Sequence, residues 1–205
     1  MSLITHGRCD ILHTPLFCYT FEMDGRTIIS GKTKNGKQYI IRYPKNEDAP
    51  MMLEYINVLS REQTFIPFQG EQLTLKEEQK FLSDMLNKIE KLTAVMLFLV
   101  VDDKVVGITQ IDMKDRTEKH TGVLGISVAK EMRGQGMGKL MINLILQEAK
   151  RCIPNIEIVT LEVFAPNNIG LDMYRKAGFS EFGRLPKGIV YKNKREDLVY
   201  MYQEL

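Results

Sequence analysis

The sequence predicts an α/β fold in which a single sheet carries helices on both faces. Segments with the apolar patterns of strands alternate along the chain with segments of helical spacing. In the middle, residues 121–151 join an apolar strand, a glycine-rich turn and an amphipathic helix. The chain has 205 residues, of which 44% are hydrophobic, which is enough for a sizeable core. We therefore expect residues 1–205 to form a single domain.

The segment 121–151 predicts the centre of this fold. Val123–Val128 is apolar at most positions and follows a glycine, as expected of a buried strand. The turn after it reads Arg133-Gly134-Gln135-Gly136-Met137-Gly138. A helix follows from about Gly138 to Arg151, and its predicted apolar face consists of Leu140, Met141, Leu144, Ile145 and Ala149.

The glycine-rich turn has the features of an anion-binding site. Gly134, Gly136 and Gly138 leave the backbone bare, so its N–H groups can approach a ligand closely. The helix behind it adds unpaired N–H groups and the positive end of its dipole. The flanking Arg133 and Lys139 are unfavourable at the start of an isolated helix but favourable beside an external anion such as phosphate. A glycine turn that merely packs tightly is the alternative.

Two other phosphate-binding patterns fail on spacing. A P-loop would place Ser or Thr after Lys139, where this chain has Leu140. A dinucleotide-binding fingerprint needs glycines at its first, third and sixth positions, whereas here they occupy the first, third and fifth. The pattern that fits is Arg-x-x-Gly-x-Gly after a strand, which Arg133, Gly136 and Gly138 fill.

With this pattern, the segment resembles the acetyl-CoA-binding motif of the GNAT superfamily of N-acetyltransferases. A second motif of that family follows at the expected spacing, as Asn167-x-x-Gly170-x-x-Met173-Tyr174-x-Lys176-x-Gly178-Phe179. The family usually has Ala and Leu where this chain has Gly170 and Met173. The resemblance covers roughly residues 38–205, the expected acetyltransferase core. It implies a mixed central sheet with helices on both faces.

The resemblance also implies acetyl-CoA as co-substrate, in a wedge between the fourth and fifth core strands, Val123–Val128 and Ile156–Val163. Backbone groups at the end of the fourth strand would pair with pantetheine, and amides of the turn would hold the pyrophosphate. Asn167 would contribute its side-chain amide. The implied cofactor-binding residues are Ile126, Ser127, Val128, Arg133, Gly134, Gln135, Gly136, Met137, Gly138, Lys139 and Asn167.

Tyr174 corresponds to the tyrosine that family members place near the departing sulfur. A phenol, whose ordinary pKa is about 10, can donate a hydrogen bond or a proton to a thiolate, whose parent thiol has a pKa of about 8.5. A tyrosine that only packs at a helix end is the alternative. The general base is open, because Val123–Val128 contains no carboxylate. Glu162 on the next strand is the first candidate, followed by Glu54, Asp112 and Glu71.

In this family the loop between the first two helices lines the acceptor site. The substrate-pocket candidates from that loop are Phe65, Phe68, Glu62 and Glu71, with ordinary packing as the alternative. Three functions are open: an N-acetyltransferase for a small-molecule or amino-acid-like amine, a protein N-terminal acetyltransferase of the ribosomal-protein kind, and a non-catalytic acyl-CoA-binding sensor. The missing strong base favours an α-amine or arylamine acceptor, or a base that acts through water.

Residues 1–37 precede the resemblance and predict an added hairpin at a sheet edge. Phe17–Phe21 and Thr27–Ser30 have strand patterns and are joined through Asp24-Gly25, a hairpin signal. Asn35-Gly36 is a second turn and leads into Gln38–Tyr43, the first core strand. A contact between two copies of the chain, giving a homodimer, is the alternative role for this extension.

Caps and turns predict the remaining elements. Asp48 and Pro50 begin one helix, and the capping box Thr74-x-x-Glu77 begins the next. The other expected elements are a hairpin of Ala94–Val101 and Val105–Met113, a helix from Asn167 to about Gly178, and two closing strands, Phe179–Gly183 and Leu198–Tyr202, joined by the connection Leu185–Asp197.

Composition and charge exclude several classes of function. A net charge of +2, with both signs interspersed, provides no strong field for nucleic acid. The longest apolar run, Ala94–Val101, is far shorter than the ~20 residues of a membrane-spanning helix. Cys9, Cys18 and Cys152 show no metal-ligand spacing, so we expect no metal. An odd number of scattered cysteines favours a reducing compartment, hence the cytoplasm.

Overall fold

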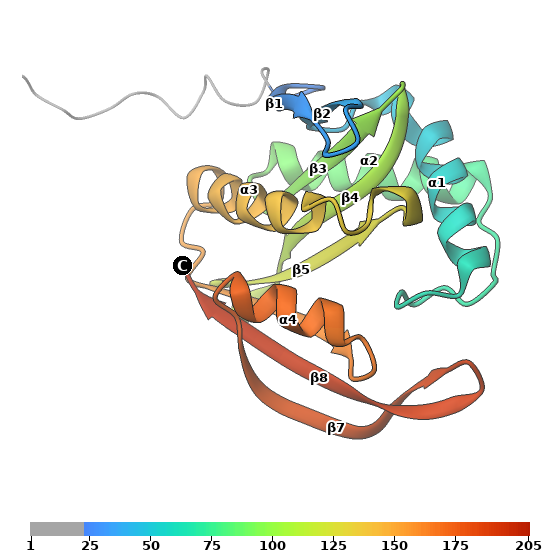
Figure 1. Ribbon diagram of the computed structural model, residues 1–205. Coiled ribbons are helices and arrows are strands. Elements are labelled where there is room, and N and C mark those ends of the chain that lie inside the picture. The colour runs from blue at the N-terminus through green and yellow to red at the C-terminus, as the bar shows by residue number, and fades with distance from the viewer. Residues whose placement is uncertain (1–22) are drawn as a thin grey trace, which may run out of the picture.

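The computed structural model describes residues 23–205 and contains one eight-stranded sheet (Figure 1). The predicted strand Phe17–Phe21 lies outside the described residues, as do Cys9 and Cys18. The strands are ordered β1-β2-β3-β4-β5-β6-β8-β7, and every neighbouring pair is antiparallel except β5 and β6. The sheet is therefore mixed, as expected.

The elements have the following bounds. The strands are β1 Thr27–Lys32, β2 Gln38–Arg42, β3 Ala94–Val101, β4 Lys104–Met113, β5 Thr121–Val128, β6 Ile158–Phe164, β7 Ser180–Tyr191 and β8 Lys194–Glu204. The helices are α1 Ala49–Glu62, α2 Leu75–Glu90, α3 Met137–Cys152 and α4 Asn168–Lys176. Short 3-10 turns occupy Asn46–Asp48, Arg116–Glu118 and Lys130–Met132.

Helices cover both faces of the sheet, which confirms the predicted fold class. On one face, Tyr55 of α1 donates a hydrogen bond to Ser127 Oγ of β5 at 2.9 Å. On the other face α3 packs against β3, β4 and β5, and the Met141 sulfur lies against Gly107 of β4. In Figure 1, α3 and α4 lie in front of the sheet and α2 lies behind it.

The core is centred on β3, where no residue is more than 9% exposed. A strand covered on both faces reads as a continuous apolar run, which explains the uninterrupted sequence AVMLFLVV. The stripe of α3 meets it with Met141, Ile145 and Ala149, all fully buried. Among residues 23–205, no helix has the length and apolar character needed to cross a membrane.

The strands β5 and β6 pair over only three residues, Thr121–Val123 with Ile158–Thr160, and then part. Along β5, Thr121 O accepts from Lys114 N and the Ala129 N–H donates to Val106 O, so odd-numbered residues direct their backbone groups toward β4. Even-numbered residues consequently face β6. Because the pairing ends at Val123, Ile126 and Val128 have no strand partner on that side.

The C-terminal segment differs from the prediction of two short strands with a long connection. β7 and β8 are 12 and 11 residues long and are joined directly through Lys192 and Asn193, both with positive φ. That turn has the backbone of a tight hairpin without its usual Asn-Gly sequence. Pro186 and Gly188 lie within a register shift between Leu185 and Ile189, where a strand tolerates them.

At the other end of the sheet, β1 forms a hairpin with β2 through the turn that Asn35-Gly36 predicts. The residues before it are tied to the end of β2, since Tyr43 N donates to Arg26 O and Gly25 N donates to Pro44 O. The described part of the N-terminal extension is thus the edge strand of the same sheet.

A buried carboxylate fastens this edge to α3. Glu148 is 8% exposed, and its Oε2 accepts hydrogen bonds from Arg26 and Arg151, each at 2.6 Å, and from the Tyr43 hydroxyl at 2.9 Å. Burial alone would raise the pKa of Glu148. Hydrogen bonds from Arg151 and Tyr43, with the charges of Arg151 and Arg26, outweigh burial and hold the pKa below its ordinary value.

We predict that Glu148→Gln lowers the free energy of unfolding at pH 7 by about 1–3 kcal/mol, because the charged acceptor of three donors is lost. A carboxyl group whose pKa is depressed in the folded state contributes stability that is present above its unfolded pKa of about 4.3. This contribution is lost as the pH falls below that value and through the folded-state pKa. Urea unfolding should therefore show a smaller difference between wild type and variant at pH 3 than at pH 7. The exposed Glu204→Gln is the control, and equal effects of both substitutions at pH 7 would contradict the assignment.

Candidate functional site

A cavity of about 720 Å³ opens where β5 and β6 part. Its walls come from the end of β5, the turn that follows it, the first turn of α3, helix α4 and the connection between α1 and α2. All three predicted β5 contacts, Ile126, Ser127 and Val128, line it, and so do Asn167 and Tyr174 of the second motif. The structure therefore brings the two sequence motifs to one cavity.

The three glycines of the turn serve different purposes. Gly134 and Gly136 have φ of +73° and +85°, and a Cβ added to either would meet no atom within 4 Å. These positions need glycine for the backbone conformation, and the open space beside them lets a ligand approach. Gly138 is different, because a Cβ there would lie 2.8 Å from the Met173 sulfur of α4. Gly138 thus allows α3 and α4 to pack closely.

Helix α3 presents its N-terminus to the same cavity. Its first turn contains no acidic residue, and no side chain caps it. The first helical hydrogen bond runs from Leu140 N to Gly136 O, and within the described chain the N–H groups of Met137, Gly138 and Lys139 have no acceptor. Free N–H groups at the positive end of a helix dipole form an anion-binding site.

The Arg133 side chain is engaged within the protein. Its Nε donates to Val128 O at 2.9 Å, and its guanidinium forms an ion pair with Glu62 at 2.8 Å. Arg133 therefore connects the end of α1 to the end of β5, and its backbone N–H is occupied as well, by Lys130 O at 3.2 Å. Glu62, predicted for the acceptor pocket, has this structural contact instead of a free carboxylate.

The end of β5 offers both backbone and side-chain groups. Arg133 occupies the Val128 carbonyl, which leaves the Val128 N–H and the backbone of Ile126 directed into the gap beside β6. The backbone of Ser127 faces β4, but its hydroxyl lines the cavity and accepts from Tyr55. Burial raises the pKa of Tyr55, so its hydroxyl remains a donor in this pair.

Asn167 and Tyr174 are held by α4. The Asn167 Oδ1 accepts from Gly170 N at 3.0 Å and caps the helix, so only its NH₂ group is available to a ligand. Tyr174 is 8% exposed, and its ring contacts Phe179 edge-on at 6.1 Å. Burial raises the pKa of Tyr174 to about 12. Tyr174 lines the cavity, and its hydroxyl has no hydrogen-bond partner among residues 23–205, so the protonated phenol is available as a donor.

The carboxylates considered as general bases lie outside the cavity wall. Glu162 is exposed on β6, Asp112 pairs with Lys88, and Glu54 pairs with Lys104. Glu71 is exposed and accepts from the Gln69 N–H, and backbone hydrogen bonds lower its pKa. Asp172 is the single carboxylate in the wall as described, and it bonds to Arg175. The pairings of Asp112 and Glu54 join segments far apart in the chain, so the sequence could not exclude these two carboxylates as bases.

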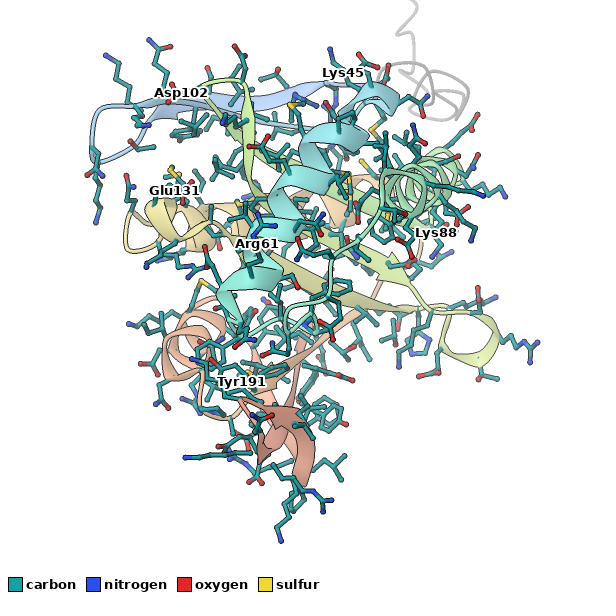
Figure 2. All side chains as sticks on the ribbon, turned by 90° about the vertical axis from the view of Figure 1, so that its right-hand side faces the viewer. Lys45, Arg61, Lys88, Asp102, Glu131 and Tyr191 are labelled. Atoms are coloured by element: carbon teal, nitrogen blue, oxygen red, sulfur yellow. The ribbon has the colours of Figure 1, made fainter. Side chains whose placement is uncertain are left out.

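An aromatic cluster bounds the cavity on the side of the α1–α2 connection. Phe65 lines the cavity, with its ring centroid 5.0 Å from Tyr191 and 6.3 Å from Phe164. Phe164 and Tyr191 are 5.8 Å apart. Figure 2 shows Tyr191 below Arg61, on the hairpin under the end of α1. The predicted Phe68 packs against the core and is not part of the wall.

Phe164 and Tyr191 were absent from the predicted site. Phe164 follows directly after the predicted fifth core strand, and Tyr191 fell in a segment interpreted as a connection. No local signal marks either residue, because their contact with Phe65 depends on the tight turn between β7 and β8. Within residues 23–205, no group of three or more His, Cys, Asp or Glu side chains could hold a metal ion.

A curated relative matches part of the chain. YwnH of Bacillus subtilis (strain 168), named provisionally as a phosphinothricin acetyltransferase, is 34% identical over 87 residues, which cover 42% of this chain. The chain thus spans about half of that relative, 51% of its length.

Solved structures match most of the fold. An acetyltransferase of the GNAT family from Streptococcus pneumoniae has a TM-score of 0.74 and 25% identity, over 82% of this chain and 99% of its own. Ribosomal-protein-alanine N-acetyltransferase from Brucella melitensis has a TM-score of 0.70 and 22% identity, over 80% and 99%. A phosphinothricin acetyltransferase from Sinorhizobium meliloti, solved with acetyl-CoA, has a TM-score of 0.71 and 14% identity, over 82% and 88%.

The family model for the acetyltransferase (GNAT) family matches residues 55–179. This range contains the end of β5, the glycine turn, α3 and all of α4, which form most of the cavity wall. Because the match covers more than half of the chain, the protein belongs to the GNAT acetyltransferase family.

Proposed function

We propose that this protein transfers the acetyl group of acetyl-CoA to the primary amine of a small molecule. The observation that carries the proposal is the cavity beyond the point where β5 and β6 part, which residues of the glycine turn and the start of α3, with free N–H groups, and Tyr174 line together. This arrangement provides an anion-binding end and a donor for a leaving group, both of which a CoA thioester needs.

The cofactor part of the proposal uses backbone groups. The amides of residues 134–139 would hold the pyrophosphate, which glycine permits at Gly134 and Gly136 because no side chain intervenes. The free groups of Ile126 and the Val128 N–H would pair with pantetheine as a neighbouring strand does. The NH₂ group of Asn167 is also available.

The chemistry is a direct attack of the amine nitrogen on the thioester carbonyl, followed by breakage of the C–S bond. The Val128 N–H is positioned to stabilise the oxyanion, a contribution of about 3–4 kcal/mol in comparable sites. With a pKa of about 12, the Tyr174 phenol holds its proton more firmly than a thiol of pKa about 8.5. Tyr174 therefore acts by donating a hydrogen bond to the departing thiolate, and the proton that neutralises the sulfur comes from the ammonium group or solvent.

The lack of a free carboxylate in the described wall bears on the acceptor. An amine attacks only as the free base, and no side chain of the wall is placed to remove a proton from an ammonium group of high pKa. An α-amine has a pKa of about 8 against about 10.4 for a lysine side chain, so it needs less assistance at neutral pH. An α-amine or arylamine is the acceptor that fits this wall.

The aromatic cluster supports a small acceptor over a polypeptide. Phe65 and Tyr191, with ring centroids 5.0 Å apart, link the α1–α2 connection to the β7–β8 hairpin. A polypeptide leaving the cavity on that side would have to separate these two segments. The named relatives include enzymes for phosphinothricin and for a ribosomal protein, so the fold does not choose between the two acceptor classes, and the proposal of a small acceptor is supported by the cluster.

We predict that a turnover screen with acetyl-CoA detects acetylation of small α-amines and arylamines but not of peptide N-termini. The readout is release of free thiol, with acetylated product identified by mass spectrometry. Turnover of peptides alone would favour the protein N-terminal acetyltransferase, and CoA binding without any turnover would favour the sensor. Either result would overturn the small-amine proposal.

We predict that Tyr174→Phe lowers single-turnover rates by roughly ten- to a thousandfold, because a hydrogen-bond donor to the developing negative charge is lost. The ring and its contact with Phe179 remain, so the melting temperature should be unchanged. CoA affinity should also be unchanged, because the hydrogen bond strengthens only as the sulfur becomes negative. Full activity in this variant would show that Tyr174 only packs.

We predict that Gly136→Ala weakens CoA binding at least tenfold by calorimetry, because the methyl group occupies the space in which phosphate would approach. Gly70→Ala is the matched control, since Gly70 also has positive φ, a Cβ there would meet only Gln63 Nε2 at 3.7 Å, and the residue lies outside the cavity wall. Equal CoA affinity in the two folded variants would refute the phosphate-binding role of the turn.

A further inference from the structure

One residue in the cavity wall comes from outside the family match. Lys34 lies in the turn between β1 and β2, yet it lines the same cavity as Gly134, Gly136 and Lys139. In Figure 2 this turn lies on the left of the molecule, above the turn that precedes α3. The edge hairpin therefore contributes a cation to a site built mainly from β5, α3 and α4.

The turn that carries Lys34 is well fastened. Thr33 is 5% exposed, and its N–H donates to Lys37 O at 2.8 Å while its Oγ1 accepts from Lys37 N at 3.1 Å. Gly36, with φ of +82°, donates its N–H to Thr33 O. Lys37 pairs with Asp102 in the β3–β4 turn at 2.9 Å. These contacts fix the backbone from which the Lys34 side chain extends.

The cavity carries uncompensated positive charge. Lys34, Lys139 and Lys176 line it, and none of them has an acidic partner within residues 23–205. The other two charged side chains of the wall are neutralised locally, Arg133 by Glu62 and Asp172 by Arg175. Like charges around one cavity repel one another unless an anion joins them, so the wall fits a ligand with several negative charges.

CoA carries two separate phosphate groups, the pyrophosphate and the 3′-phosphate of its ribose. The amides of the glycine turn and of α3 suffice for the pyrophosphate, as proposed above. Lys34 approaches from a different element, and it is a point charge suited to a terminal phosphate. The geometry points to Lys34 as a residue that binds the 3′-phosphate and so selects CoA over dephospho-CoA. This inference rests on the proposed function.

The test is calorimetric binding of CoA and dephospho-CoA to wild type, Lys34→Gln and Lys32→Gln. Lys32 is exposed in the same hairpin and lies outside the cavity wall, so it controls for loss of one charge. We expect Lys34→Gln to bind CoA about tenfold more weakly, with dephospho-CoA affinity within twofold of wild type. Lys32→Gln should bind both ligands like wild type, and Lys34→Arg should restore CoA affinity.

Equal losses for both ligands in Lys34→Gln would overturn the inference, because the lysine would then act on the pyrophosphate or on the fold. Unchanged affinity for both ligands would also overturn it. Either result leaves the proposed function intact, provided wild type binds CoA. A wild-type protein that binds neither ligand would refute the proposed function itself, and the inference with it.

Discussion

The structure depends on the early separation of β5 from β6. Three paired residues hold the two strands together at one end. Beyond Val123 the backbone groups of β5 and β6 no longer form hydrogen bonds with each other as paired strands do. Unpaired N–H and C=O groups in the middle of a sheet cost free energy unless something else satisfies them. The protein meets part of that cost with the Arg133 side chain on Val128 O. The remainder lines a cavity, where a ligand can supply the missing partners.

Other parts of the fold keep that separation in place. β6 pairs along its whole length with β8, so its second edge is satisfied away from β5. Tyr55 holds Ser127 from the α1 face, while the close approach of Gly138 to Met173 sets α3 against α4. On the far side, Glu148 fixes α3 to the edge of the sheet through Arg26 and Tyr43. The opening is therefore framed on every side by fixed contacts.

The sequence indicated what is local and missed what depends on distant contacts. The glycine turn, the helix after it and Tyr174 could be predicted because their spacing is contained within short motifs. The pairing of Arg133 with Glu62, and the approach of Lys34 to the cavity, could not, since each joins segments far apart in the chain. The sequence did not identify a general base, and the described wall contains no unpaired carboxylate that could serve as one.

The β7–β8 hairpin has a further consequence for how the protein behaves in concentrated solution. β7 is an edge strand with Phe182, Leu185 and Val190 exposed, the kind of surface on which another chain can add a strand and start aggregation. Pro186 removes one donor from that edge, and the two register shifts in β7 interrupt its regular repeat. Pro186 and the register shifts thus make β7 a poor template for pairing with another chain, and they also make the strand hard to recognise from the sequence.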